Sequence, residues 1–340
     1  MKILNISTYD YGGAGNAVLR INEVFIKLNH TSKVVVFNKR SKDENVIQLT
    51  NGDFNLLLKK IYRKLYHEFQ KALTFKFIKK YNFFNYSEKS RYIRPKIILN
   101  KLDYIPEVIV VHYTSHFINF KSIYELQQLT NARIIFNMLD TAFLTGGCHY
   151  SWNCIGFHKD CSNCKALIIN KNISIKNHSF KTNYLNKMYS VKLIASSSWA
   201  INQAKMSSLF KDFEKNLIYY PLDETHFKPR DKNLIRGVLN IPIKKKVIFL
   251  GANQISDPRK GIDFAIKSLT LLYKDLSENE REKIIIVTAG NKDLNYINDL
   301  VSDLPNANKL SKMAKSFYKQ ASKKGYGNLL VSELIDKEKY

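Results

Sequence analysis

The sequence predicts an α/β fold built on doubly wound parallel sheets, and three observations indicate it. Short runs of β-branched and other apolar residues recur along the chain. Stretches with helical apolar spacing separate these runs, so strands and helices should alternate. A glycine loop follows the first run, as in many βα turns. The 340 residues suffice for roughly two domains, each with its own core.

The first elements form a βαβ unit. A strand is predicted over Lys2 to Thr8, and a buried parallel strand over Lys33 to Phe37, which is apolar on both faces. The helix between them presents one apolar face, formed by Val18, Ile21, Phe25 and Leu28. A crossover of this kind is right-handed and makes the sheet parallel.

The same rhythm continues downstream. Further strands are predicted over Glu107–His112, Arg133–Asn137, Val191–Ala195 and Asn216–Tyr220. The serines at 196–198 are suited to cap a helix from Trp199 to about Phe210. A second βα series starts with strands at Lys246–Gly251 and Ile284–Thr288. We therefore expect a first domain over residues 1–225 and a smaller second domain over 226–340.

The chain is strongly basic, with 54 Lys and Arg against 29 Asp and Glu, a net charge of +25. Such an excess favours anionic partners, although solvated lysines explain part of it. An insert at residues 54–101 interrupts the α/β rhythm. Its basic helix carries apolar residues at helical spacing: Leu57, Leu58, Ile61, Leu65 and Phe69. This pattern favours binding to an anionic membrane surface or, alternatively, a packed apolar face with a solvated basic face.

No apolar run approaches the roughly 20 residues that a bilayer span requires. The first residues read as a strand and lack the cleavage site of a signal peptide. We expect a cytoplasmic protein, peripheral at the inner face of the membrane.

Two motifs are suited to phosphate. Glycines at Gly12, Gly13 and Gly15 allow close backbone approach before a helix N-terminus, or simply form a tight βα turn. Arg259 and Lys260 follow the first strand of the second domain and can neutralise a diphosphate, or lie on an ordinary surface turn.

All four cysteines lie in a loop at residues 145–165: Cys148, Cys154, Cys161 and Cys164. Four thiolates in a short loop that ends in C-x-x-C favour a structural zinc ion, with free thiols or an iron–sulfur cluster as alternatives. A cytoplasmic chain disfavours disulfides. Two further polar residues, His112 and Asp140, end predicted strands, where α/β domains place their ligands.

Together these segments resemble the GT-B glycosyltransferases of family 4, in a subgroup associated with exopolysaccharide and O-antigen assembly. The resemblance covers most of residues 1–290. It rests on the opening strand and glycine loop through Gly15, on Thr145-Gly146-Gly147-Cys148-His149-Tyr150, on Ala195-Ser196-Ser197-Ser198-Trp199, on Tyr219-Tyr220-Pro221, and on Leu250-Gly251 through Arg259-Lys260-Gly261.

The resemblance implies two Rossmann-like domains facing a cleft, the acceptor domain first and the nucleotide-sugar domain second. It implies transfer of a sugar to a lipid-linked or saccharide acceptor in surface polysaccharide synthesis, with retention and without a catalytic metal. Arg259, Lys260 and Gly251 would hold the donor diphosphate, and the glycine loop would line the cleft. His112 would lie near the transferred sugar, and Asp140 at the cleft edge.

The sequence departs from this family in its second domain. We find no pair of glutamates about seven residues apart after Gly290, the family's late donor-binding motif. This favours a shortened donor domain and keeps open an alternative, a catalytically degenerate homologue that acts as a binding or partner protein. A nucleic-acid-binding zinc protein is a weaker hypothesis, because no recognition helix or cluster of stacking aromatics accompanies the cysteines.

Overall fold

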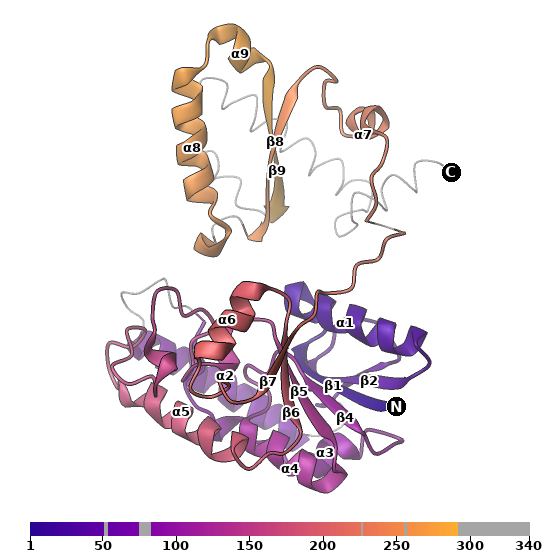
Figure 1. The fold of residues 1–340 in the computed structure, drawn as a ribbon, viewed down its shortest axis with the longest axis vertical. Coiled ribbons are helices and arrows are strands. Elements are labelled where there is room, and N and C mark those ends of the chain that lie inside the picture. The colour runs from indigo at the N-terminus through magenta and orange to yellow at the C-terminus, as the bar shows by residue number, and fades with distance from the viewer. Residues whose placement is uncertain (51–53, 75–82, 226, 255–256, 292–340) are drawn as a thin grey trace. The chain divides into compact units, whose positions relative to one another are not determined.

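The computed structural model describes residues 1–50, 54–74, 83–225, 227–254 and 257–291 (Figure 1). The chain divides into two compact units, Met1–Leu222 and Asp223–Tyr340.

The first unit is built on a seven-stranded sheet in which every pair of neighbouring strands is parallel. The strands follow the order β3-β2-β1-β4-β5-β6-β7. Their bounds are β1 (Lys2–Tyr9), β2 (Thr31–Asn38), β3 (Val46–Gln48), β4 (Val108–Val111), β5 (Arg133–Met138), β6 (Val191–Ala195) and β7 (Glu214–Leu217). The predicted α/β fold with a doubly wound parallel sheet is confirmed.

The strand order changes direction between β1 and β4, which pair with Ile3 opposite Val108 and Ile6 opposite Val111. The crevice outside the carboxyl ends of such a strand pair is where open parallel sheets bind ligands. A ligand site is therefore expected at the chain segments that follow β1 and β4.

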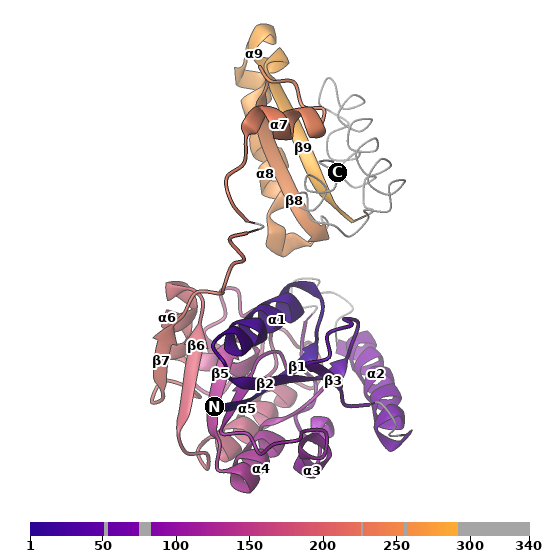
Figure 2. The same ribbon diagram turned by 90° about the vertical axis from the view of Figure 1, so that its right-hand side faces the viewer.

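Helices cover both faces of this sheet (Figures 1 and 2). They are α1 (Gly12–Lys27), α2 (Phe54–Thr74), α3 (Pro95–Leu99), α4 (Phe120–Thr130), α5 (Asn172–Leu185) and α6 (Ser198–Met206). Val18 of α1 packs against Val34 and Val36 of β2, whereas Val35 and Phe37 face the opposite cluster, which includes α4. This alternation is the period of two that a strand imposes on its side chains.

Some element bounds differ from those predicted. Strand β3 has only three residues, too few for a periodic signal, and was not predicted. Helix α6 ends at Met206 rather than near Phe210, but its predicted serine cap is present, since the Ser197 hydroxyl accepts from the Ala200 N–H. Strand β7 begins at Glu214, two residues before its predicted start, and ends at Leu217 rather than at Tyr220.

Helix α2 turns an apolar face outward. Leu57, Leu58, Ile61, Leu65 and Phe69 are between 43% and 65% exposed. Arg63, by contrast, is buried, and its guanidinium donates to backbone carbonyls of Ser90, Tyr92 and Phe117. The apolar residues at helical spacing thus do not form the packed face of this helix.

In the second unit, strands β8 (Lys246–Gln254) and β9 (Ile284–Asn291) pair in parallel. Helix α8 (Ile262–Asp275) connects them, with α7 (Lys232–Val238) before β8 and α9 (Glu278–Glu282) before β9. Ile262 and Ile266 of α8 pack with Leu250 of β8. The βαβ unit predicted for this region is present. The stretch after Gly290, in which no late acidic motif is found, lies beyond the described residues apart from Asn291.

Within the described ranges, no helix is both long enough and apolar enough to cross a membrane.

Candidate functional site at the carboxyl edge of the first sheet

The glycine loop joins β1 to α1 at the switch point, and its three glycines differ in their surroundings. Gly12 has a φ of +70°, which favours glycine. A Cβ on Gly15 would lie 2.3 Å from the carbonyl carbon of Asp10. A Cβ on Gly13 would meet nothing within 4 Å. Close packing therefore explains Gly15, whereas Gly13 faces open space at a helix N-terminus, as a residue approached by a ligand would.

The loop is held in place by Asp10. Its carboxylate is buried and accepts three hydrogen bonds from the backbone N–H groups of Arg40 and Ser41, at 2.8–3.0 Å. The Arg40 guanidinium lies over the Tyr11 ring, 3.8 Å from its centroid. This contact keeps a positive charge beside the start of α1, where the helix dipole also favours anions.

Aromatic rings connect the end of β1 with the end of β4. Tyr9 contacts Tyr11 and stacks on Tyr113, with ring centroids 5.0 Å and 6.0 Å apart. Tyr113 in turn lies 5.4 Å from the His149 ring. Burial raises the pKa of Tyr113, and the nearby Asp140 charge adds to the effect, so this phenol stays protonated.

His112, predicted to lie near the transferred sugar, is 1% exposed. Its Nε2 is 3.0 Å from Asn5 Oδ1 and its Nδ1 is 2.9 Å from Asn137 Nδ2. Burial lowers the pKa of His112 to about 3, so the ring is neutral. With both nitrogens engaged, His112 acts here as a link between β1, β4 and β5; a direct role at the sugar stays a prediction.

Asp140 follows β5 and reaches the surface with a side chain that is 10% exposed. Its Oδ1 accepts from the Ala142 N–H at 2.8 Å, and its Oδ2 lies 2.6 Å from His149 Nδ1. The carboxylate is thus fixed in orientation, and an imidazole behind it can share its charge. This is the arrangement of a positioned acid–base or charge-stabilising group.

The network continues inward through residues that the sequence did not single out for this site. His149 Nε2 is 3.2 Å from the Ser115 hydroxyl, which donates to Asn85 Oδ1 at 2.6 Å. Asn85 and His149 lie on segments that pair with each other: the Asn85 N–H donates to Gly147 and the His149 N–H to Phe83. His149 was visible only as a neighbour of the cysteines, and no spacing in the sequence connects it to Asp140.

The cysteine loop supports this pairing. Cys161 Sγ accepts from the Gly146 N–H at 3.1 Å, and the Cys148 and Cys164 thiols are hydrogen-bonded. All four cysteines are free thiols. Over the ranges that the structure describes, no group of three or more His, Cys, Asp or Glu is placed to hold a metal ion. Structural zinc at these cysteines therefore stays a prediction.

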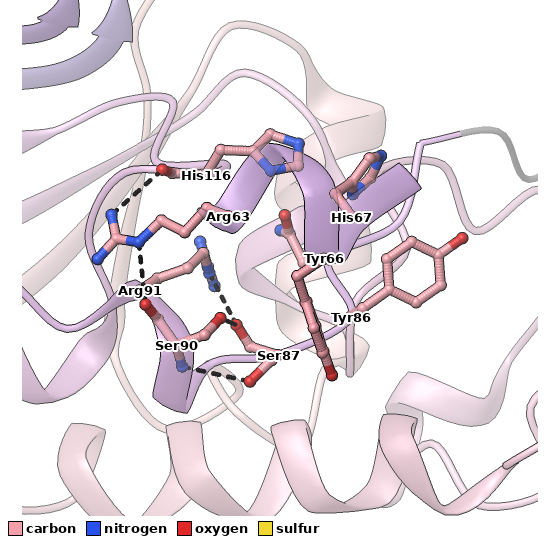
Figure 3. Close-up of a pocket in the computed structure, with 9 residues that line it drawn as sticks. Arg63, Tyr66, His67, Tyr86, Ser87, Ser90, Arg91 and His116 are labelled. Carbon is pink, nitrogen blue, oxygen red and sulfur yellow. Dashed lines mark hydrogen bonds between the residues drawn. The ribbon is translucent and has the colours of Figure 1, made fainter. Parts of the chain in front are cut away.

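A small pocket of about 20 Å³, lined in part by Asn85, lies between α2 and the segment at 83–91 (Figure 3). Arg63 and Arg91 lie on one side of it, and Tyr86 and His67 on the other. Its volume accommodates one water-sized molecule. The His67 and His116 rings meet edge to face at 4.4 Å, and burial lowers the pKa of His116 to about 3.

In the second unit, the predicted diphosphate-binding cations lie in a 3-10 turn at Pro258–Lys260, directly before α8. The Arg259 Nε donates to both carboxylate oxygens of Asp257, at 2.9 Å and 3.0 Å. This pairing lowers the pKa of Asp257. Lys260 is exposed, and Gly261 takes a φ of +67° at the helix start. Gly251 lies in β8 where its register with β9 shifts.

No known protein-family model matches the chain, and no curated protein matches it either. Solved structures similar to it include three glycosyltransferases. WaaG, a glycosyltransferase involved in lipopolysaccharide biosynthesis, is 12% identical over 89% of this chain and 67% of its own length, with a TM-score of 0.44. A glycosyltransferase from Rickettsia africae is 12% identical over 94% and 66%, with a TM-score of 0.46. Anabaena Alr3699/HepE, in complex with UDP, is 13% identical over 93% and 67%, with a TM-score of 0.46. The chain spans about two thirds of each structure's length.

Proposed function

We propose that the protein is a GT-B-type sugar transferase. It would move a sugar from a nucleotide-sugar donor to a saccharide or lipid-linked acceptor in surface polysaccharide synthesis, with retention and without a catalytic metal. The observation that supports it best is the Asp140 carboxylate, fixed by the Ala142 N–H and His149 at the carboxyl edge of a doubly wound parallel sheet.

Asp140 would act on the acceptor side of the reaction. Its exposed edge would accept a hydrogen bond from the acceptor hydroxyl and orient it. Its negative charge would also stabilise the positive charge that develops at the anomeric carbon as the leaving group departs. His149 is a positioning residue, because its Nδ1 holds the carboxylate and its ring is buried.

Arg259 and Lys260 would act on the donor side. Lys260 supplies an exposed positive charge, and Arg259 is already oriented by Asp257. Together with the N-terminus of α8 they would offset the charge of the leaving diphosphate. Replacing either residue by alanine should weaken donor binding about tenfold to a hundredfold, since each charge-assisted hydrogen bond contributes about 1.5–3 kcal/mol.

A transfer assay with Asp140→Asn tests the acceptor-side role. Removing the charge while keeping the shape should lower kcat about a hundredfold with little change in donor affinity, which is typical for loss of one positioned electrostatic group. Asp103→Asn is the control, because Asp103 is an exposed carboxylate that precedes β4 at the opposite edge of the sheet. Equal rates for the two variants would contradict the role given to Asp140.

An alternative is a homologue that binds but no longer transfers sugar. Thermal-shift measurements with UDP-, GDP- and dTDP-sugars separate the cases, since a ligand of the native state raises the melting temperature. Stabilisation without turnover would favour the alternative, and turnover would exclude it.

We also propose that α2 binds an anionic membrane surface. The support is its exposed apolar face at Leu57, Leu58, Ile61, Leu65 and Phe69, next to exposed Lys59 and Lys64. Apolar side chains that would enter the headgroup region, with lysines beside them, are what an interfacial helix needs. Each lysine near anionic lipid contributes about 1 kcal/mol.

Vesicle co-sedimentation tests this second proposal. The wild type should bind vesicles with 30% phosphatidylglycerol more strongly than pure phosphatidylcholine, and Leu65→Glu should bind several-fold less. Leu129→Glu is the control, because Leu129 lies on α4 and is 49% exposed. Equal loss in both variants, or binding that ignores lipid charge, would contradict a specific role for α2.

A further inference from the structure

A groove of about 640 Å³ lies within the first unit, beside the small pocket of Figure 3. Its walls come from α2, from the segment at 83–91 and from α5. The groove and the small pocket are neighbours, because both are lined by Tyr66, Tyr86 and Ser87. The volume is within the range of small-ligand sites, about 300–1,000 Å³.

Aromatic rings from three different elements line this groove: Tyr66 on α2, Tyr86 before the 3-10 turn at Lys89–Arg91, and Phe180 on α5. Tyr86 is buried and packs with Phe84 and Ile173, which fixes its ring. Tyr66 packs on the same cluster and is half-buried. The half-buried rings of Tyr66 and Phe180 offer flat apolar surfaces to a ligand at little entropic cost.

The charge of the groove is positive. Lys89, in the 3-10 turn, and Lys176, on α5, both line the groove and are exposed. The acidic side chain in its lining, Glu88, is 1% exposed and already paired with Arg91 and Lys181. Ser87 and Ser179 add hydroxyl groups. A ligand that fits would combine a flat apolar face, hydroxyl groups and a negative charge.

We propose that this groove binds an acidic saccharide, a sugar segment that carries carboxylate groups. The C–H face of a pyranose ring would lie on Tyr66 and Phe180, and its carboxylate would pair with Lys176 and Lys89. The lining contains no glycine loop of the kind that nucleotide sites use for phosphate groups. The assignment of this saccharide as the acceptor glycan rests on the proposed transferase function.

The groove is joined to the carboxyl-edge site by a chain of contacts. Asn85 lines the small pocket next to the groove, and it accepts from Ser115, whose hydroxyl contacts His149. His149 holds Asp140. A glycan bound in the groove would therefore lie behind the same segment, 83–91, that helps to position the Asp140 network.

Saturation-transfer NMR and calorimetry on the full chain test the proposal without a donor. The probes are tetragalacturonate and a hyaluronan tetrasaccharide, with the neutral chitotetraose for comparison. We expect binding of at least one acidic probe, weakened by salt, and weaker binding of the neutral one. Tyr66→Ala and Phe180→Ala should each lower affinity about tenfold, the loss expected for one ring-stacking contact.

Matched variants separate the groove from general effects. Tyr219→Ala removes the same side chain from a position that is 73% exposed and outside the groove lining, and should bind like wild type. Lys176→Ala should lower affinity for acidic probes several-fold and leave chitotetraose unchanged. No binding of either acidic probe, or equal loss in the Tyr219 and Tyr66 variants, would overturn the proposal. Because no sugar transfer is measured, such a result would leave the transferase function standing.

Discussion

Substitution of two glycines in one loop, Gly13→Ala and Gly15→Ala, should have opposite effects on stability. Both residues lie in the first turn of α1 and differ by a single methyl group from alanine. A methyl at Gly15 would lie 2.3 Å from the Asp10 carbonyl carbon and 2.9 Å from its Cα, well below the ordinary contact distance of 3.4 Å. The Asp10 backbone cannot retreat freely, because its carboxylate is held by three hydrogen bonds.

The magnitudes follow from these distances. Overpacking of this kind costs about 1–3 kcal/mol, and the strain here is against backbone rather than a flexible side chain. Alanine regains up to about 1 kcal/mol of helix propensity. Gly15→Ala should therefore lower the free energy of unfolding by about 2 kcal/mol. Gly13→Ala, with nothing within 4 Å of its Cβ, should leave it unchanged or raise it by up to about 1 kcal/mol.

Urea denaturation followed by far-UV circular dichroism measures both changes. A Gly13→Ala variant as destabilised as Gly15→Ala would refute the reasoning, since it would mean that Gly13 is packed. If the fold is intact and a nucleotide-sugar binds at this loop, Gly13→Ala should also weaken that binding, because the added methyl occupies the open space at the helix N-terminus.

Two further predictions concern buried polar groups. Burial lowers the pKa of His112 from 6.5 to about 3, so below pH 6.5 the unfolded chain takes up a proton that the native state does not. The free energy of unfolding should be full above pH 6.5 and fall by about 2 kcal/mol at pH 5. In urea titrations His112→Gln should show a shallower pH dependence, and an unchanged slope would contradict this. Lys181 is 1% exposed, donates to the carbonyls of Ala142 and Thr145 at 2.6 Å and 2.7 Å, and pairs with Glu88. Lys181→Met should destabilise the fold by about 3–5 kcal/mol, because it leaves the Glu88 carboxylate buried with one cation fewer. A loss below about 1 kcal/mol in urea titration would argue against this pairing.

The sheet was predictable because its strands carry their signal locally. Val34, Val35 and Val36 are apolar on both faces, and such a run has few uses other than a central parallel strand. The Ser197 cap was predictable for the same reason. Strand β3 is too short for any period to appear.

The helix α2 shows where periodicity misleads. Its leucines have helical spacing, yet the packed positions include Leu56 and Arg63, and the leucines that set the period face outward. Arg63 is tolerated because backbone carbonyls from distant segments satisfy its guanidinium. No local pattern announces those partners.

Part of the candidate site was visible in the sequence and part was not. Asp140 and the glycine loop end predicted strands, so their place at the carboxyl edge followed from the parallel topology. The pairing of Asp140 with His149, and of Ser115 with Asn85, depends on how the segments at 83–85 and 147–149 meet. That meeting is a tertiary contact between residues more than 60 positions apart, and one sequence carries no sign of it.

The central claim is that this chain transfers sugar, and the most direct measurement is turnover by the purified full chain. Mass spectrometry would follow consumption of UDP-, GDP- and dTDP-sugars and the gain of a hexose on acidic and neutral oligosaccharides. We predict product with the wild type, about a hundredfold less with Asp140→Asn, and wild-type rates with Asp103→Asn. Absence of product from every donor, although a donor stabilises the fold, would contradict the transferase function.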